Sequence, residues 1–357
     1  MKESISRITL LMALLFVAGL VSSCAGAPAL PSWPGPLLAG ETLYIGSQAG
    51  RVFALNPASG AEVWQYPPAG DNTTIGALWG TPAVGNETLY IGSENSQLYA
   101  LDTNTGTQRW TVSTDGRIAG SSVVAEGKVF VGSSDHNVYA WDAQNGRKEW
   151  EFPTGNWVWG RPVAADGKVY VGSFDKTMYC LDAENGSQVW AFEAGGAIAG
   201  GAAVTDGLVI FGALDNKVYA LNADDGTKAW EFSADRWFWA RPVVVDGTVY
   251  VGSLDQTVYA LDAESGARVW SFVTDGMIRA AAAISDGQLY VGSEKGTVYA
   301  LDATTGQQLW LATLGKSIVT APAVDGGTVY VNTFGDALYA LDAASGAQRW
   351  TLTPSKR

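Results

Sequence analysis

Two indoles and one guanidinium alternate with other residues in a stretch that occurs twice, 80 positions apart. The two copies are Trp157, Trp159 and Arg161, and then Trp237, Trp239 and Arg241. Alternate residues of an extended chain point to the same side, so each copy gathers its three side chains on one face. Such a face suits a sugar, a peptide or an aromatic anion, and its residue types are enriched at protein interfaces. Comparable positions hold Trp79, Arg117 and Arg279.

The sequence contains few residues that could catalyse a reaction or bind a metal. The single histidine, His136, lies in a polar turn, so no histidine pair or triad can form. A carboxylate does recur just before a turn, where aspartate accepts hydrogen bonds from backbone N–H groups. Its copies are Asp102, Asp142, Asp182, Asp262, Asp302 and Asp342. Because they are so widely repeated, we interpret them as structural, and we expect no catalytic residue and no metal site.

The elements that must position the candidate residues are repeats that each close on a tryptophan. The spacing is 40 residues from Trp110 onward, and only the first interval is longer, at 46. A period of this size indicates a solenoid, a propeller or an array. The closing residues are Trp64, Trp110, Trp150, Trp190, Trp230, Trp270, Trp310 and Trp350.

Each repeat reads as four short antiparallel strands joined by tight turns. In residues 162–192, Asp166-Gly167 suits a type I′ hairpin, and KVYVG and TMYCLD alternate as strands do. Eight such units follow one another with no helical pattern between them, and a four-stranded sheet alone cannot bury both of its faces. Radial stacking solves this, so we predict an all-β, eight-bladed β-propeller.

The candidate binding residues precede the first apolar run of their repeats. We therefore expect them in the innermost strand of each blade, lining one mouth of a central channel. The intervening positions Gly80, Gly120, Gly160 and Gly200 are small, as a crowded axis requires. An alternative is that blades 4 and 6 arose by duplication, and that their tryptophans fill gaps beside alanine-bearing neighbours.

The repeated phrase Ala100-x-Asp102-x-x-Thr105-Gly106-x-x-x-Trp110 resembles the tryptophan-docking motif of the pyrroloquinoline quinone (PQQ) repeat family. The resemblance covers nearly the whole mature chain and implies that each closing tryptophan locks its blade to a neighbour. It does not imply a function. Quinone-dependent dehydrogenases with similar blades pair adjacent cysteines and hold calcium beside a catalytic aspartate. This chain has only Cys24 and Cys180, so PQQ stays a candidate from resemblance alone, and we expect no cofactor.

The beginning of the chain indicates export. A mostly apolar run, Ile8 to Val21, is shorter than a membrane span and suits a signal peptide. It ends at Val21-Ser22-Ser23-Cys24, which resembles the lipobox of bacterial lipoproteins and implies cleavage before a lipidated Cys24. We therefore predict a signal peptide at 1–23, a lipid-anchored tether at 24–31 and a propeller at 32–357, on the periplasmic or extracellular face of an envelope membrane.

Three functions remain open at this stage. The lipobox, size and repeat type resemble the lipoprotein scaffolds of outer-membrane protein assembly, which favours a monomeric, non-catalytic propeller that binds envelope proteins. A module that binds a sugar, a peptide or a quinone comes second, and an enzyme third. The net charge of −13 argues against nucleic acid as a partner. Ring closure is also open: the strand at Trp350 completes its own blade, or residues 29–33 add to it.

Overall fold

The computed structural model describes residues 35–71, 73–334 and 337–353, which all belong to one compact unit, Ser32–Arg357. The predicted signal peptide, Cys24 and the tether lie outside the described residues. Within the described part, no helix is long and apolar enough to cross a membrane.

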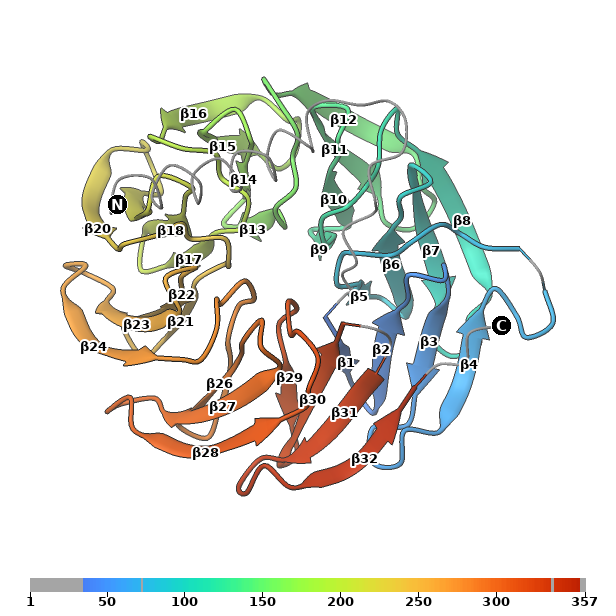
Figure 1. The fold of residues 1–357 in the computed structure, drawn as a ribbon. Helices are drawn as coiled ribbons and strands as arrows, with labels where there is room; N and C mark the ends of the chain where they lie inside the picture. The colour runs from blue at the N-terminus through green and yellow to red at the C-terminus, as the bar shows by residue number, and fades with distance from the viewer. Residues whose placement is uncertain (1–34, 72, 335–336, 354–357) are drawn as a thin grey trace, which may run out of the picture. The chain divides into compact units, whose positions relative to one another are not determined.

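The described residues form eight antiparallel sheets of four strands each, arranged in a ring (Figure 1). The predicted eight-bladed propeller is therefore confirmed. Blades 1 to 4 consist of β1 (Leu37–Ala39), β2 (Thr42–Gly46), β3 (Val52–Leu55), β4 (Glu62–Tyr66); β5 (Ala83–Gly85), β6 (Thr88–Gly92), β7 (Gln97–Asp102), β8 (Gln108–Ser113); β9 (Val123–Ala125), β10 (Lys128–Gly132), β11 (Asn137–Asp142), β12 (Lys148–Pro153); β13 (Val163–Ala165), β14 (Lys168–Gly172), β15 (Thr177–Asp182) and β16 (Gln188–Glu193). Blades 5 to 8 consist of β17 (Ala203–Thr205), β18 (Leu208–Gly212), β19 (Lys217–Asn222), β20 (Lys228–Ser233); β21 (Val243–Val245), β22 (Thr248–Gly252), β23 (Thr257–Asp262), β24 (Arg268–Val273); β25 (Ala283–Ser285), β26 (Gln288–Gly292), β27 (Thr297–Asp302), β28 (Gln308–Thr313); β29 (Ala323–Asp325), β30 (Thr328–Thr333), β31 (Ala337–Asp342) and β32 (Gln348–Leu352).

Blade 4 shows how the sequence produces each sheet. Asp166 and Gly167 both take positive φ, 51° and 71°, which a type I′ turn requires, and they join β13 to β14. The β-branched and aromatic residues of β14 are buried from Val169 to Gly172, because both faces of the sheet are covered by neighbouring blades. The outer strand β16 alternates more strongly and keeps its polar residues exposed.

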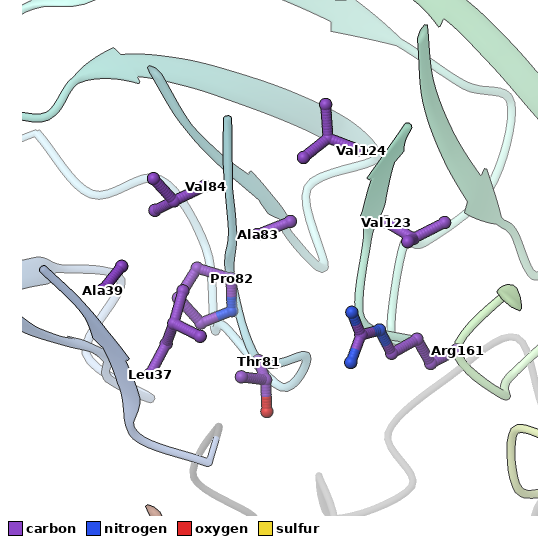
Figure 2. Close-up of a pocket in the computed structure, with 9 residues that line it drawn as sticks. All are labelled: Leu37, Ala39, Thr81, Pro82, Ala83, Val84, Val123, Val124 and Arg161. Carbon is purple, nitrogen blue, oxygen red and sulfur yellow. The ribbon is translucent and has the colours of Figure 1, made fainter. Parts of the chain in front are cut away.

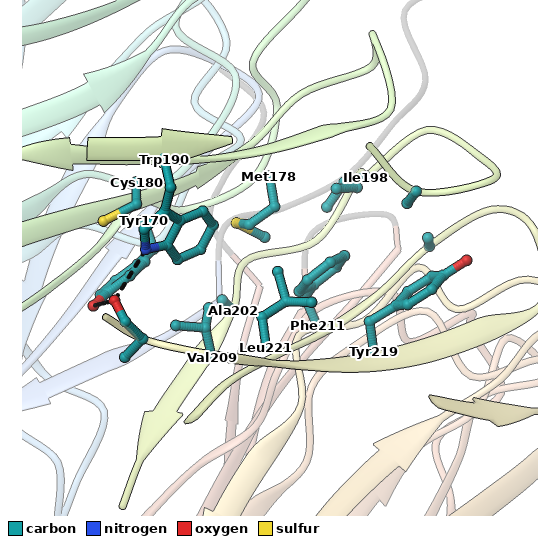
Figure 3. Close-up of a cluster of buried hydrophobic side chains, with 13 residues drawn as sticks. Tyr170, Met178, Cys180, Trp190, Ile198, Ala202, Val209, Phe211, Tyr219 and Leu221 are labelled. Atoms are coloured by element: carbon teal, nitrogen blue, oxygen red, sulfur yellow. Dashed lines mark hydrogen bonds between the residues drawn. The ribbon is translucent and has the colours of Figure 1, made fainter. Parts of the chain in front are cut away.

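The hydrophobic core consists of eight separate clusters, one at each boundary between blades. Figure 3 shows the cluster between blades 4 and 5, where Trp190 and Met178 from blade 4 face Phe211 and Leu221 from blade 5. Cys180 is fully buried in this cluster, and burial raises the pKa of its thiol to about 11. Each blade is thus stabilised by its two neighbours and not by a core of its own.

The closing tryptophans connect neighbouring blades in all eight repeats. Each indole N–H donates to a backbone carbonyl oxygen of the next blade at 2.8–3.2 Å. The ring face packs on the turn glycine of that blade: a Cβ on Gly186 would lie 2.6 Å from Cδ2 of Trp150. Only glycine permits this close approach together with its positive φ of 75°.

The same contact closes the ring. Trp350 donates from Nε1 to the carbonyl oxygen of Pro57 in blade 1 at 3.0 Å, and one cluster joins Tyr330 and Leu338 to Leu43 of blade 1. Strand β32 completes its own blade beside β31, which is the first of the two predicted alternatives. Residues 29–33 lie outside the described residues.

The repeated aspartates stabilise the turns that the indoles contact. Oδ1 of Asp102 accepts backbone N–H groups of Asn104 and Thr105 at 3.0 and 2.9 Å. The guanidinium of Arg109 donates to Asp102 at 2.6 Å and, as the largest cause, holds the pKa of this carboxyl at about 2. These contacts agree with the structural interpretation of the repeated carboxylates.

Candidate binding site at one mouth of the propeller

The predicted binding residues lie in mouth segments, a name we give to the stretches that join the outer strand of one blade to the inner strand of the next. The segment at residues 154–162 runs from β12 to β13. The expectation that Trp157 to Arg161 belong to the innermost strand was therefore wrong, because that strand is only Val163–Ala165. The segment is instead held by backbone bonds to neighbouring turns, such as Val158 N–H to the Ser133 carbonyl at 3.1 Å.

The mouth segments nevertheless alternate as the sequence indicates. Val158 and its counterparts are buried between blades, and a Cβ on Gly160 would lie 2.5 Å from the Gly200 carbonyl oxygen of the next segment. Gly80 and Gly120 make equally close approaches. The small positions thus let the mouth segments crowd around the axis, and the side chains between them project away from these contacts.

Three of the predicted tryptophans come together through one phenylalanine. The ring centroids of Trp79 and Trp159 are 5.6 Å apart at an interplanar angle of 74°. Phe174 lies 6.4 Å from Trp159 and 6.3 Å from Trp239, and it also contacts Trp157 at 6.4 Å. These aromatic rings therefore form a connected group that draws on blades 2, 4 and 6.

The blades between them carry small residues. Ala119 and Ala199 occupy the positions equivalent to Trp159 in blades 3 and 5. Trp79 and Trp159 contact each other directly, and Phe174 bridges Trp159 and Trp239, so part of the role of these indoles is packing, as the duplication alternative predicts. All five rings of the group remain half-buried and not fully buried, so each keeps surface that a partner could contact.

Arg279 and Arg117 each have an acidic partner. The guanidinium of Arg279 lies 5.6 Å from the centre of the Trp239 ring and pairs with Glu294. Arg117 pairs with Glu94 at 3.5 Å and, among the described residues, makes no cation–π contact of the kind that Arg279 makes. Trp237 likewise makes no ring contact with another described residue, although its carbonyl oxygen accepts the Leu254 N–H at 2.9 Å.

Phe174, Glu94 and Glu294 were not predicted from the sequence as site residues. All three occupy the same position in the turn between the second and third strands of their blades. Ser134, Leu214, Leu254 and Phe334 hold this position in other blades. The variation from blade to blade was a visible signal, because it matches that of the mouth segments.

Arg161 and Arg241 both border Gly201: a Cβ on this glycine would lie 2.8 Å from the carbonyl oxygen of Arg161 and 3.1 Å from Cδ of Arg241. Arg161 lines an axial hollow of about 200 Å³ whose walls come from β1, β5 and β9 (Figure 2). In Figure 2 its guanidinium reaches toward the strand that carries Ala83, and Thr81 is the other polar side chain of the lining. The Arg161 side chain keeps contact with solvent, and the blades around it partly desolvate its guanidinium, which lowers the pKa of this group.

The mouth face also carries the additional residues of the longer first interval. Arg51, in the turn between β2 and β3, donates to the carbonyl oxygens of Pro67 and Asp71 at 3.1 and 2.9 Å. This turn is the blade 1 counterpart of the one that holds Phe174, so the insertion lies on the same face as the aromatic group. In repeat proteins, insertions on one face often mark the binding face.

Comparison with known proteins identifies the family. The family described as outer membrane protein assembly factor BamB matches residues 23–77, 72–156, 154–236, 179–283 and 255–356. The chain belongs to this family. No curated protein matched the chain by sequence.

Solved structures share the fold of this BamB-family chain at low identity. BamB from Moraxella catarrhalis is 22% identical, with a TM-score of 0.71 over 84% of this chain and 91% of that one. The computationally designed Ika8 protein is 17% identical, with a TM-score of 0.75 over 85% and 94%. A europium-containing methanol dehydrogenase is 17% identical, with a TM-score of 0.69 over 88% and 82%. At these identities the likeness shows the fold alone.

The described residues supply neither the metal ligands nor the cysteine pair that the resemblance to quinone-dependent dehydrogenases implies. In the described part of the chain, no three His, Cys, Asp or Glu side chains are grouped as metal ligands. Cys180, the one cysteine described, is buried between blades 4 and 5 and has no adjacent cysteine. We therefore derive no redox step for this protein.

Proposed function

We propose that this chain is a non-catalytic scaffold of the cell envelope that is tethered by a lipid on Cys24. Its mouth face would bind protein partners in outer-membrane protein assembly. Membership of the BamB family supports the process, and the lipobox-like sequence supports the location.

The observation that carries the proposal is the half-buried aromatic group of Trp79, Trp157, Trp159, Phe174 and Trp239. Large aromatic side chains in contact with arginine, here Arg279, are the residue types that dominate binding energy at protein interfaces. They sit on a rigid ring, so a partner would meet a preorganised surface and little ordering entropy would be lost.

Site-specific photo-crosslinking in native envelopes tests the proposal. Arg236 is exposed beside Trp237 on the mouth face, and Glu264 is exposed in the turn after β23, at the opposite end of the same blade. A photo-reactive residue at position 236 should capture components of outer-membrane protein assembly, and one at position 264 should not. Equal capture at both positions, or none at either, would contradict the proposal.

A module for a small ligand is the competing function. It predicts no protein-sized adduct at position 236, together with a change in indole fluorescence when a sugar, peptide or quinone is added. The double variant Trp159→Ala/Trp239→Ala should abolish that fluorescence change.

A further inference from the structure

On the face opposite the mouth, a lysine of one blade reaches an acidic residue of the next blade at two neighbouring boundaries. Nζ of Lys128 donates to Glu184 at 2.9 Å between blades 3 and 4, and Nζ of Lys168 donates to Asp224 at 3.0 Å between blades 4 and 5. The two lysine side chains are only 12% and 23% exposed, whereas their acidic partners are largely exposed. Each of these boundaries therefore holds a primary alkylammonium group against the turn of the next blade.

The boundary between blades 5 and 6 keeps the acidic residue and lacks the lysine. Glu264 follows Asp224 by 40 positions, but Leu208 follows Lys168 by 40 positions. The other five boundaries have neither residue, and their acid position holds Ala58, Asn104, Gln144, Thr304 and Ala344. The repeat thus combines this acid with a lysine twice and leaves the acid without one once.

A hollow of about 400 Å³ lies at the boundary that lacks the lysine. Leu208 and Glu264 both line it, together with two further carboxylates, Asp206 and Asp262. No lysine or arginine is among its lining residues in the described chain. A leucine side chain ends at Cδ, two atoms before the point where lysine carries its ammonium group, so Leu208 leaves the polar end of this space empty.

A backbone acceptor at the same boundary also loses its side-chain donors from the second strand. Between blades 4 and 5, Lys168 and Tyr170 donate to the Ala223 carbonyl oxygen at 3.1 and 3.5 Å. Leu208 and Ile210 replace these two residues in blade 5, so the equivalent carbonyl oxygen of blade 6 receives neither bond. The hollow therefore offers a carbonyl oxygen as well as carboxylates to a donor.

The carboxylates of the hollow have no cationic partner. Among the described residues, Asp206, Asp262 and Glu264 take part in no ion pair. The counterpart of Asp262 in blade 2 binds an arginine at 2.6 Å, whereas Val269 occupies that arginine position in blade 6. Hydrogen bonds from Ser265 lower the pKa of Asp262, so this group is charged at neutral pH. Like charges that are close together and lack a counter-ion favour the binding of a cation.

We propose that this hollow binds an aliphatic diamine, with one ammonium group against Glu264 in the position that corresponds to Nζ of Lys168. An ammonium group has three N–H donors, which suit the carboxylates and the carbonyl oxygen of the site. The alkyl chain packs on Leu208, as the stem of a lysine packs on apolar surface. A second ammonium group is favoured because three carboxylates line the hollow. This inference goes beyond the proposed scaffold, because the site lies on the opposite face and its occupant is a small cation.

Calorimetric titration of the full mature chain with 1,4-diaminobutane tests the site. Tetramethylammonium chloride at matched ionic strength is the control, because this cation carries charge but has no N–H donor. We expect saturable binding of one diamine per chain and none of tetramethylammonium. No saturable binding of the diamine up to about 10 mM, or equal binding of both cations, would overturn the proposal with the wild-type chain alone.

Variants then locate the site. Leu208→Lys should abolish diamine binding, because a tethered ammonium group then occupies the hollow as Lys168 occupies the neighbouring boundary. Glu264→Gln should weaken binding by about tenfold, because it removes one charged acceptor. Glu184→Gln is the matched control: its carboxylate already binds Lys128, so the diamine affinity should not change.

The unfolding midpoint of each variant shows that it is folded. Wild-type affinity in folded Leu208→Lys, or equal weakening by Glu264→Gln and Glu184→Gln, would contradict the assignment. The crosslinking at position 236, on the opposite face, reports on protein partners separately, so the two proposals can fail independently.

Discussion

The eight closing tryptophans, which we call the belt, are the same in every blade, whereas the residues at the mouth of the propeller differ from blade to blade. One repeat produces both regions. In the belt, all eight tryptophans make the same hydrogen bond to the next blade. At the mouth, equivalent positions hold Trp159, Ala199 and Arg279. What every blade shares is needed to build a blade. What differs between blades is available for binding, and the comparison therefore predicts where stability and binding can be separated.

The largest difference should come from removing one indole from each region. Trp190→Ala should destabilise the fold by about 3–5 kcal/mol, because it empties a buried site between blades 4 and 5 and removes the bond to the Ala223 carbonyl. Trp157→Ala should cost about 1 kcal/mol, since this side chain is half-buried and contacts a single ring. Urea unfolding of both variants measures the difference in unfolding free energy. Equal losses would contradict the claim that the closing tryptophans contribute more to stability than the mouth tryptophans.

Two glycines of blade 4 separate the effect of backbone strain from the effect of the tryptophan contact. Gly186 and Gly167 have nearly equal positive φ, 75° and 71°, but only Gly186 faces an indole, that of Trp150. Gly167→Ala should cost about 1–2 kcal/mol from backbone strain alone. Gly186→Ala should cost about 1–3 kcal/mol more, because its Cβ would overlap the ring. Thermal or urea unfolding compares them, and indistinguishable midpoints would show that the ring face contributes nothing.

Acid should destabilise the fold at the turns that the closing tryptophans contact. The pKa of Asp102 lies at about 2 in the folded chain, below its ordinary value of 3.8, so the charged form is favoured by folding. The stability from this group is present above about pH 4 and is lost as the pH falls toward 2. Asp102→Asn should therefore flatten the dependence of the unfolding free energy on pH between about 4 and 2. Unchanged dependence in urea titrations would contradict the assigned Arg109 contact.

The smallest effect is expected within the mouth itself. Trp237→Ala should change the unfolding free energy by less than about 1 kcal/mol, because this side chain contacts no other described ring. Trp159→Ala should cost more, since Trp159 touches both Trp79 and Phe174. If the two variants unfold alike, the aromatic group is not a packed unit.

The fold could be predicted because its signals are local and repeated. The 40-residue spacing of the tryptophans and turns such as Asp166-Gly167 report contacts within one blade or with its neighbour. The site was harder to predict, since Phe174 joins tryptophans of blades that are not adjacent. The assignment of Trp157 to the innermost strand failed for a related reason: extended backbone alternates whether or not it pairs in a sheet.

The most direct test asks whether folding and partner binding separate in one variant. Trp159→Ala/Trp239→Ala should be combined with the photo-reactive residue at position 236, and both its unfolding midpoint and its crosslinked adducts measured in parallel with Trp190→Ala. The account predicts a folded variant with a modest loss of stability and no adduct with assembly components. A variant that loses as much stability as Trp190→Ala, yet still forms the adduct at wild-type yield, would show that these indoles serve packing and that the mouth is not the binding site.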